Sequence, residues 1–270
     1  SCITQQLDIL SNLREPLADR RFIHMLDHFD LIASIYDRLI GPPDTERLRQ
    51  LLNLPTNGWL LDGGGGTGRV SSHLNGLAAH VVVSDLSHRM LKKAREKKVC
   101  PVRAHVEHLP FANEFFDRIV SIGMFEHVGD RNYRTFMKVV RRCLKEDGLF
   151  LLHTIAGNTS VHSVDPWISK YIFPNSMLPS AKQISSASEG LLVLEDWHSF
   201  GQYYDPTLMA WHQNFTKNWN KIKDRYDNRF YRMWTYYLLS CAASFRARRN
   251  QLWQIVFSKK GIRGGYQYRI

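Results

Sequence analysis

The chain has few cysteines and no long hydrophobic run. Its 270 residues include four cysteines, and no two of them form a CxxC pair. This distribution argues against a zinc site and a disulfide scaffold, and it fits a reducing compartment. No apolar run approaches the ~20 residues that a membrane-spanning helix needs. We therefore expect neither a metal site nor a membrane span.

The N-terminal residues lack the charged and then apolar pattern of a secretory signal. The expected location is therefore the cytoplasm, peripheral to the inner membrane. The remaining composition is that of an ordinary globular protein, with 44% hydrophobic and 23% charged residues. A chain of this length and composition can bury one large core.

Acidic residues are outnumbered by basic ones. The chain has 36 Lys and Arg against 25 Asp and Glu, and its formal net charge is +11. Such a balance favours acidic partners, which include nucleic acid, an anionic membrane surface and acidic substrates. The imbalance is strongest in residues 246–270, where seven Lys or Arg occur without any Asp or Glu. This segment is either a solvated basic tail or a membrane-binding segment.

Short apolar strands alternate with amphipathic helices through the first 155 residues. The predicted strands cover 59–62, 80–85, 101–105, 116–123 and 148–155, and the predicted helices cover 21–40, 45–52, 67–77, 87–98 and 131–144. This alternation predicts an α/β fold with a mostly parallel sheet and helices on both faces. Right-handed crossovers then place the carboxyl ends of the strands along one edge, where ligands bind.

The rest of the chain predicts a substrate cap and the last strands of the same sheet. The cap begins at residue 156, and further elements are expected at 191–196 (strand), 206–226 and 227–247 (helices) and 251–259 (strand). We expect one domain over 1–270. It divides into N-terminal helices (1–55), a cofactor-binding core (56–155), a cap with helices (156–250), and a last strand with a basic tail (251–270).

A glycine-rich loop follows the first predicted strand, with the sequence Leu-Leu-Asp-Gly-Gly-Gly-Gly-Thr-Gly at 60–68. Glycines after a strand let the backbone approach a ligand closely, and the helix that follows presents free N–H groups. The loop satisfies both the dinucleotide pattern GxGxxG and the DxGxGxG pattern of class I methyltransferases. The glycines alone do not decide between these two patterns.

Two acids favour the methyltransferase. Asp62 closes the first strand, where its carboxylate could hold the α-amino group of S-adenosylmethionine. A dinucleotide offers no cation there, and an acid near its pyrophosphate would be repulsive. Asp85 ends the next strand, 23 residues later, in a position suited to two ribose hydroxyls.

Residues 28–120 resemble class I methyltransferases of the ubiquinone and menaquinone type. The resemblance is carried by Ser-Asp-Leu-Ser at 84–87, Met-Leu at 90–91, Glu-His-Leu-Pro-Phe at 107–111 and Phe-Asp-Arg-Ile-Val at 116–120. It implies a Rossmann-like seven-stranded fold with S-adenosylmethionine as the cofactor. The implied cofactor residues are Asp62, Gly64, Gly66, Thr67 and Gly68 in the loop, Asp85 at the ribose, Leu86 and Met90 against adenine, and Val106 and Glu107 at the adenine edge. His105 stands where these enzymes usually carry an acid that contacts the adenine amino group.

Residues 116–259 resemble bacterial cyclopropane-fatty-acyl-phospholipid synthases. The matching strings are SIGMFEHVG at 121–129, FLLHTI at 150–155, DPWI at 165–168, KYIFP at 170–174, EDWH at 195–198, LMAW at 208–211, TYYL at 235–238 and QLWQ at 251–254. The resemblance implies methyl transfer to a cis double bond of a phospholipid acyl chain. The resulting carbocation then loses a proton, which a bound bicarbonate takes, and closes to a cyclopropane ring.

The same resemblance implies an anion site beside the acyl chain. Glu126, His153, the backbone of Ile155 and Tyr237 would hold the bicarbonate, because a hydroxyl, an imidazole and a backbone N–H can all donate to an anion. Four aromatic residues could shelter the cation through their ring faces, namely Phe125, Trp167, Tyr171 and Tyr236. Without the resemblance, Glu126, His153 and Tyr237 are better explained as a strand-end cap and core packing.

The front of the chain departs from the synthase pattern. Those enzymes carry a cysteine in a Tyr-Ser-Cys-Ala-Tyr block that helps to hold bicarbonate, whereas residues 36–43 here are Tyr-Asp-Arg-Leu-Ile-Gly-Pro-Pro. The chain thus resembles a hybrid with a join between about 111 and 121.

Three functions remain open at this point. They are a cyclopropane-forming lipid methyltransferase, a methyltransferase without ring closure on an acyl chain, a quinol or another small molecule, and an inactive cofactor-binding, lipid-associated protein. The expected partners are a phospholipid acyl chain and an anionic membrane surface. A homodimer is left open. Nucleic acid is not expected, because no Asn-Pro-Pro-Tyr-type motif follows the fourth strand.

Overall fold

The computed structural model describes residues 45–76, 78 and 80–267. The predicted helix at 21–40 and the segment 36–43 lie outside the described residues. The predicted helix at 45–52 is confirmed as α4 (Thr45–Leu52).

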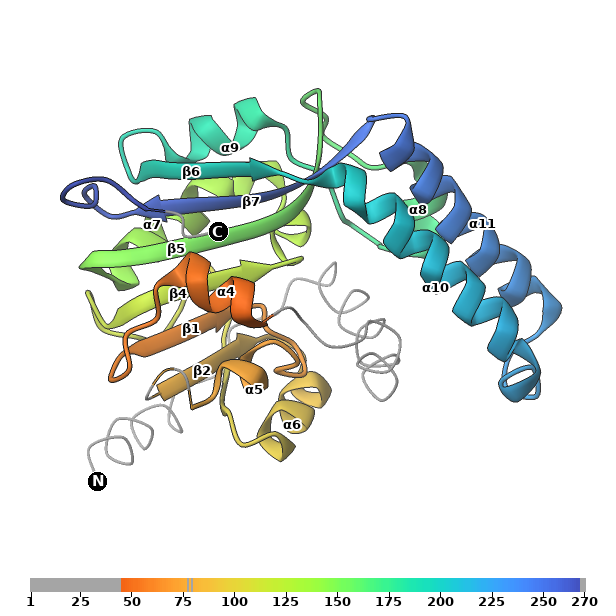
Figure 1. Cartoon of the computed structure of the whole chain (residues 1–270), viewed down its shortest axis with the longest axis horizontal. Coiled ribbons are helices and arrows are strands. Elements are labelled where there is room, and N and C mark those ends of the chain that lie inside the picture. The colour runs from red at the N-terminus through yellow and green to blue at the C-terminus, as the bar shows by residue number, and fades with distance from the viewer. Residues whose placement is uncertain (1–44, 77, 79, 268–270) are drawn as a thin grey trace.

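Seven strands form one twisted sheet in the order β3-β2-β1-β4-β5-β7-β6 (Figure 1). The strands are β1 (Trp59–Gly63), β2 (His80–Asp85), β3 (Cys100–Arg103), β4 (Phe116–Ile122), β5 (Leu144–Gly157), β6 (Val193–Ser199) and β7 (Asn250–Ser258). Strands β1 to β5 pair in parallel, and β7 pairs antiparallel with both β5 and β6. The predicted α/β fold with a mostly parallel seven-stranded sheet is confirmed.

Helices cover both faces of the sheet, and further helices lie beyond the strand ends. The described helices are α4, α5 (Ser71–Leu74), α6 (His88–Glu96), α7 (Tyr133–Cys143), α8 (Pro166–Tyr171), α9 (Ala181–Ser188), α10 (Tyr204–Asn218) and α11 (Asn228–Arg246). Successive strand residues point to opposite faces. Leu60 therefore joins one buried cluster with α4, α5 and α6, while Leu61 joins the other with α7 and α9. Each face of the sheet is buried by its own set of helices.

The helix predicted at 67–77 is much shorter than expected. Residues 67–70 form turns, and only α5 (Ser71–Leu74) is helical. Gly68 has a φ of +66°, a left-handed conformation that glycine adopts without strain and that a helix interior does not contain. The loop thus continues past its last glycine before the helix begins.

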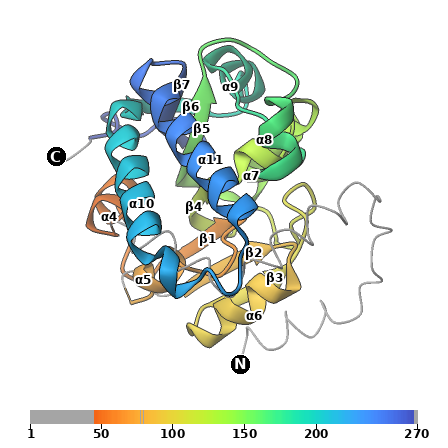
Figure 2. The ribbon, with the colours of Figure 1, turned by 90° about the vertical axis from the view of Figure 1, so that its right-hand side faces the viewer.

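Helices α10 and α11 form an antiparallel pair that projects beyond the carboxyl ends of the parallel strands (Figures 1 and 2). The pair is held to the sheet by a third buried cluster, which comprises Leu208, Leu238, Ala242, Phe245 and Leu252. Leu252 belongs to β7, so the cluster ties the pair to the strand next to the β6 edge of the sheet. This position places α11 beside the edge where a ligand is expected.

The predicted basic tail is partly neutralised inside the protein. Arg246 pairs with Asp205 at 2.8 Å, Lys259 pairs with Glu114 at 2.8 Å, and Lys260 pairs with Glu146. Lys259 is only 8% exposed. These cations therefore contribute to the fold rather than to a free basic arm.

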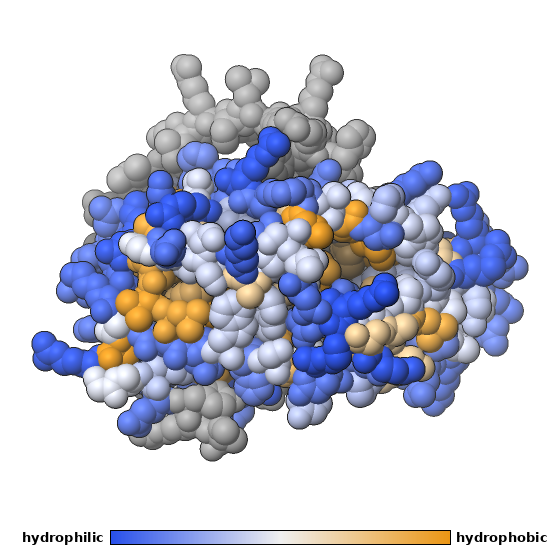
Figure 3. All heavy atoms as spheres, turned by 90° about the horizontal axis from the view of Figure 1, so that it is seen from above, coloured by the Kyte–Doolittle hydropathy of each residue, from blue (hydrophilic) through white to orange (hydrophobic). Residues whose placement is uncertain are grey.

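The outer surface is mainly hydrophilic when seen from above, with hydrophobic residues in separate groups (Figure 3). None of the described helices combines the length and the apolar character that crossing a membrane requires.

Candidate active site

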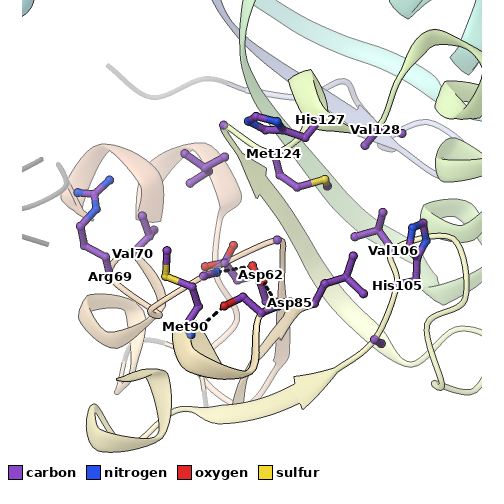
Figure 4. Close-up of a pocket in the computed structure, with 18 of the residues that line it drawn as sticks. Asp62, Arg69, Val70, Asp85, Met90, His105, Val106, Met124, His127 and Val128 are labelled. Carbon is purple, nitrogen blue, oxygen red and sulfur yellow. Dashed lines mark hydrogen bonds between the residues drawn. The ribbon is translucent and has the colours of Figure 1, made fainter. Parts of the chain in front are cut away.

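A pocket opens at the carboxyl ends of β1, β2 and β4, with the glycine loop on one side and residues 104–107 on the other (Figure 4). It is lined by Asp62, Gly64, Gly65, Gly66, Arg69, Val70, Asp85, Leu86, Ser87, Met90, Ala104, His105, Val106, Glu107, Ile122, Gly123, Met124, His127 and Val128. The space enclosed is about 1150 Å³, part of it open to solvent. This is the switch-point crevice at which open α/β sheets bind ligands.

The glycine loop brings bare backbone to the pocket. Gly64 has a φ of +76°, and a Cβ added there would lie 2.2 Å from the Cγ of Met124. Its N–H donates to the carbonyl of Ser84 at 2.7 Å. Gly66 has a φ of +56°. Both positions therefore require glycine, the first also because the loop approaches Met124 closely.

Asp62 is buried at the base of the loop. Ser71 Oγ donates to its carboxylate, and a Cβ on Gly65 would lie 2.5 Å from that carboxylate. The pKa of Asp62 is raised to about 6, mainly by burial and also by the nearby charge of Asp85, against the opposing effect of the hydrogen bond from Ser71. A cation in the pocket would favour the ionised form. The α-amino group of S-adenosylmethionine meets this requirement.

Asp85 is held by two backbone donors. The N–H of Gly66 donates to Oδ2 at 3.0 Å, and the N–H of Ser87 donates to Oδ1 at 2.8 Å. Ser87 also caps α6 by accepting from the N–H of Met90 at 3.1 Å. These bonds fix the carboxylate at the mouth of the pocket, where ribose hydroxyls could donate to its remaining lone pairs.

Eight of the ten predicted cofactor residues line this pocket, and two do not. Thr67 is buried beneath the loop, and its Oγ1 accepts from Lys97 Nζ at 3.3 Å. Gly68 packs against α6, because a Cβ there would lie 3.0 Å from Val99 and 3.2 Å from Ala94. Both residues support the loop from behind and lie outside the pocket lining.

The pocket includes residues that were not predicted from the sequence as cofactor contacts. Arg69 and Val70 follow the loop directly, and Met124, His127 and Val128 come from the turn after β4. The only signal for the second group was its place in the string at 121–129 that resembles the synthases. The sequence alone does not indicate which side chains of a turn face a ligand.

Three side chains capable of binding a metal meet at the rim of the pocket. His105, Glu107 and His108 each offer a ligand atom, and these atoms lie within 4.8 Å of one another. His105 Nδ1 lies 3.7 Å from Glu107 Oε2. Burial lowers the pKa of His105, which favours the neutral imidazole that a metal would bind. The expectation of no metal site stays a prediction.

Glu126 lies beside the pocket on the short 3-10 turn η1 (Phe125–His127). Its Oε1 accepts from the N–H of Ile155 at 2.7 Å, while its buried Oε2 has no hydrogen-bond partner among the described residues. Burial raises the pKa of Glu126 to about 7, against the opposing effect of its hydrogen bonds. The turn therefore holds a buried carboxyl group that exchanges a proton near neutral pH.

His153 precedes Ile155 by two residues on β5, so the two side chains share one face of the strand. The pKa of His153 is lowered to about 4, mainly by burial and also by the charges of Arg47 and Arg69. The imidazole is therefore neutral at pH 7. The same positive potential that disfavours an imidazolium favours a small anion nearby.

Tyr237 is linked to the turn that carries Glu126 through Phe173 and the residues that follow it. The ring of Phe173 lies 5.9 Å from that of Tyr237 and 6.1 Å from that of His127 in the cofactor pocket. Tyr237 also packs against the third buried cluster, as Ile155 does. Four residues beyond Phe173, the N–H of Met177 donates to the carbonyl of Glu126 at 2.7 Å. The segment 173–177 thus lies between α11 and the Glu126 turn.

The four aromatic residues predicted to shelter a cation do not gather here. Phe125 is fully buried and stacks on Tyr133 at 4.0 Å, so it belongs to the core. Trp167, Tyr171 and Tyr236 line a separate groove. The rings beside the predicted anion residues are instead Phe173 and Phe200, of which Phe200 lies 5.7 Å from His153.

The sheet order, the glycine loop and the paired acids define a Rossmann-like class I methyltransferase that depends on S-adenosylmethionine. Comparison with known proteins specifies the family. The family model described as mycolic acid cyclopropane synthetase matches residues 45–255, and the chain belongs to this family. The match includes the glycine loop and does not stop at the join predicted between about 111 and 121.

Individual relatives agree with this assignment. The cyclopropane-fatty-acyl-phospholipid synthase of Escherichia coli K12 is 42% identical over 268 residues, which cover 91% of this chain and 70% of that protein. The mycolic acid cyclopropane synthase CmaA1, solved with SAH and CTAB, has a TM-score of 0.70 at 26% identity and covers 80% of this chain and 82% of its own. The cyclopropane synthase MmaA2 of Mycobacterium tuberculosis has a TM-score of 0.75 at 23% identity, over 91% of this chain and 100% of its own, which supports the fold.

Proposed function

We propose that this protein forms cyclopropane rings on the unsaturated acyl chains of phospholipids. The observation that carries the proposal is the position of Glu126. Its turn begins directly after Met124, and Met124 and His127 both line the cofactor pocket. A buried group that titrates near pH 7 therefore lies beside the place where a methyl group would be delivered.

The cofactor supplies an electrophilic methyl group when it is bound. Asp62 would hold its amino group and Asp85 its ribose, while Met90 and Val106 give the adenine apolar neighbours. Transfer of the methyl to one carbon of a cis double bond leaves a cation on the other carbon. Loss of a proton from the transferred methyl then lets the new C–C bond close the ring. The net gain of the acyl chain is one methylene group.

Bicarbonate is our proposal for the proton acceptor, and the described residues fit a small anion. Glu126 Oε2 is a buried oxygen without a partner among the described residues, and it could accept the hydroxyl of the anion. Neutral His153 and Tyr237 each bring one donor. The N–H of Ile155 donates to Glu126 in the structure. Its predicted contact with the anion therefore stays a prediction.

The acyl substrate itself gives the direct test. We would incubate the protein with S-adenosylmethionine and vesicles of unsaturated phospholipid and analyse the lipids by mass spectrometry. We expect unsaturated chains to gain one methylene and to become resistant to ozonolysis. Saturated chains should stay unchanged. A measurable affinity for the cofactor without any lipid product would refute the proposal.

Methyl transfer without ring closure is the second candidate. It is favoured by the missing cysteine at 36–43, which lies outside the described residues. A relative in Pseudomonas putida that is 32% identical over 53% of this chain carries the name probable fatty acid methyltransferase. The product would also gain one methylene but would keep a double bond, so ozonolysis separates the two candidates.

We further propose that the protein works in the cytoplasm at the inner membrane, and as a homodimer. The net charge of +11 supports contact with an anionic surface.

The homodimer is supported by β6, an edge strand on which Val193 and Leu194 are 42% and 46% exposed. Exposed apolar edges pair readily with other chains. Sedimentation velocity of the wild type and of Leu194→Lys tests this. A monomeric wild type would contradict the dimer.

A further inference from the structure

A second hollow lies on the outside of the molecule, between α8 and α11. It is lined by Trp167, Tyr171, Arg229, Arg232, Met233 and Tyr236 and encloses about 690 Å³ open to solvent. We call it the α8–α11 groove. Figure 2 shows that both helices lie on the side of the molecule where α10 and α11 project. None of the described residues that line the groove lines the cofactor pocket.

The helical repeat of α11 places the groove residues and Tyr237 on different sides of the helix. Arg229, Arg232, Met233 and Tyr236 follow the spacing i, i+3, i+4 and i+7, so they share one face. That face is the groove wall, and Tyr236 is 58% exposed on it. The next residue, Tyr237, turns inward and meets Phe173. A molecule held in the groove is thus about one helix width from Tyr237.

The groove carries positive charge that the fold does not neutralise. Neither Arg229 nor Arg232 forms an ion pair with a described residue, in contrast to the paired cations of the C-terminal segment. Lys170 adds a third cation, with its Nζ 5.2 Å from the centre of the Tyr171 ring. The pKa of Tyr171 is lowered by Lys170 and by Arg229, which agrees with a positive potential at this point.

No acid lines the groove, and the two nearest acids in sequence are committed elsewhere. Asp165 caps α8 by accepting from the N–H groups of Trp167 and Ile168. Asp227 caps α11 by accepting from the N–H of Phe230. Both carboxylates accept from backbone N–H groups, and neither forms an ion pair with Arg229 or Arg232.

The kind of anion follows from the residue types. Guanidinium groups bind phosphate through paired N–H donors. Tryptophan and tyrosine favour the boundary between water and hydrocarbon, because each has an apolar ring and one polar atom. The groove is short, since α8 has only six residues, and it offers no extended basic track along which a nucleic acid could run. This combination suits a phosphate at a lipid surface.

We propose that the α8–α11 groove binds the phosphate of a phospholipid headgroup at the surface of a bilayer. Arg229 and Arg232 hold the phosphate, and Trp167 and Tyr236 lie at the level of the headgroups. The inference rests on the proposed function, because a phospholipid substrate must reach Tyr237 with its acyl chains while its headgroup stays in water. The groove meets this geometry by lying on the outer side of the same helix.

The test is binding to vesicles of dioleoyl-phosphatidylglycerol by flotation at low salt. The groove variant is the double substitution Arg229→Gln with Arg232→Gln. The matched control is Lys138→Gln with Lys182→Gln, which removes two exposed charges from α7 and α9. We expect the groove variant to bind about 30-fold more weakly, from roughly 5-fold for each charge at a membrane surface. The control should bind nearly as well as the wild type.

Equal losses in the groove and control variants would overturn the proposal, because binding would then follow net charge alone. So would an unchanged groove variant. Tighter, arginine-dependent binding of a single-stranded oligonucleotide than of the vesicles would also overturn it. Equal melting temperatures for the wild type and both variants ensure that folding does not explain the result.

Two activity measurements separate this inference from the proposed function. On vesicles, the groove variant should lose product in proportion to its binding. On a short-chain unsaturated phospholipid dispersed in detergent, its KM should rise while its kcat stays constant, because the arginines bind the headgroup and do not touch the reacting carbons. A wild type that binds vesicles through the arginines but makes no product on any lipid would refute the proposed function and support the groove. Equal product on vesicles from the wild type and the groove variant would refute the groove alone.

Discussion

Replacement of Glu126 by glutamine should change how stability depends on pH. The carboxyl group has a pKa of about 7 in the folded protein and 4.5 as its reference value. The folded state therefore holds the proton more tightly than the unfolded state. The resulting stabilisation is present below pH 4.5 and is lost as the pH rises through about 7. Glutamine does not titrate, and its amide oxygen can still accept from the N–H of Ile155.

The difference in unfolding free energy between variant and wild type should therefore move in favour of the variant as the pH rises. Between pH 5 and pH 8 the pKa values of Glu126 correspond to a change of about 2.5 kcal/mol. For a domain of this size that is a relative gain in melting temperature of roughly 5–10 °C. Asp62 in the folded state and His153 in the unfolded state also change protonation in this range, but both residues are present in both proteins, so their contributions cancel.

The assay is thermal and urea unfolding of the wild type, Glu126→Gln and Glu189→Gln at several pH values. Glu189 is exposed and does not make a side-chain hydrogen bond to a described residue, so its variant should follow the wild type. Parallel pH curves for the wild type and Glu126→Gln would refute the reasoning. They would mean that Glu126 is solvated and ionises near its ordinary pKa.

Three further predictions concern the cofactor and the acyl site. Gly64→Ala should weaken S-adenosylmethionine binding at least 10-fold, as measured by calorimetry. The reason is that Gly64 has a φ of +76° and an added Cβ would lie 2.2 Å from a methionine side-chain carbon. The control Gly261→Ala, at a position with open space around it, should not weaken this binding. Asp62→Asn should weaken binding about 10- to 100-fold. Binding to the wild type should tighten as the pH rises through about 6, since the ionised form holds the amino group, and a pH-independent affinity would count against that role. Tyr237→Phe should lower turnover at least 10-fold while the cofactor affinity stays constant, whereas Tyr231→Phe should leave both unchanged; normal turnover in the first variant would remove its hydroxyl from the mechanism.

The sheet was predictable because most of its strands contain an apolar run, and β1, β2 and β5 end at a glycine or an acid. The strand at 80–85 and the helix at 45–52 match their predicted bounds. The helix predicted at 67–77 failed for a local reason. Periodicity does not reveal that Gly68 adopts a left-handed conformation and delays the helix start.

The cofactor site was largely predictable because the acids of neighbouring parallel strands must meet at one edge. Asp62 and Asp85 could be placed by this rule alone. The hydrogen-bond partner of the Ile155 N–H could not be predicted, because this partner is Glu126, which is 29 residues away on another element. The outward position of Tyr236 was also hidden, because it depends on how α11 packs against α8.

The central claim is that the methyl group ends in a ring, and deuterium labelling tests it most directly. We would supply S-adenosylmethionine with a trideuterated methyl group to the protein and unsaturated phospholipid vesicles. Ring closure requires one deuterium to leave the transferred methyl, so the account predicts a product with two of the three deuterium atoms and no double bond. A product that keeps all three, with a double bond or a methyl branch, would contradict it.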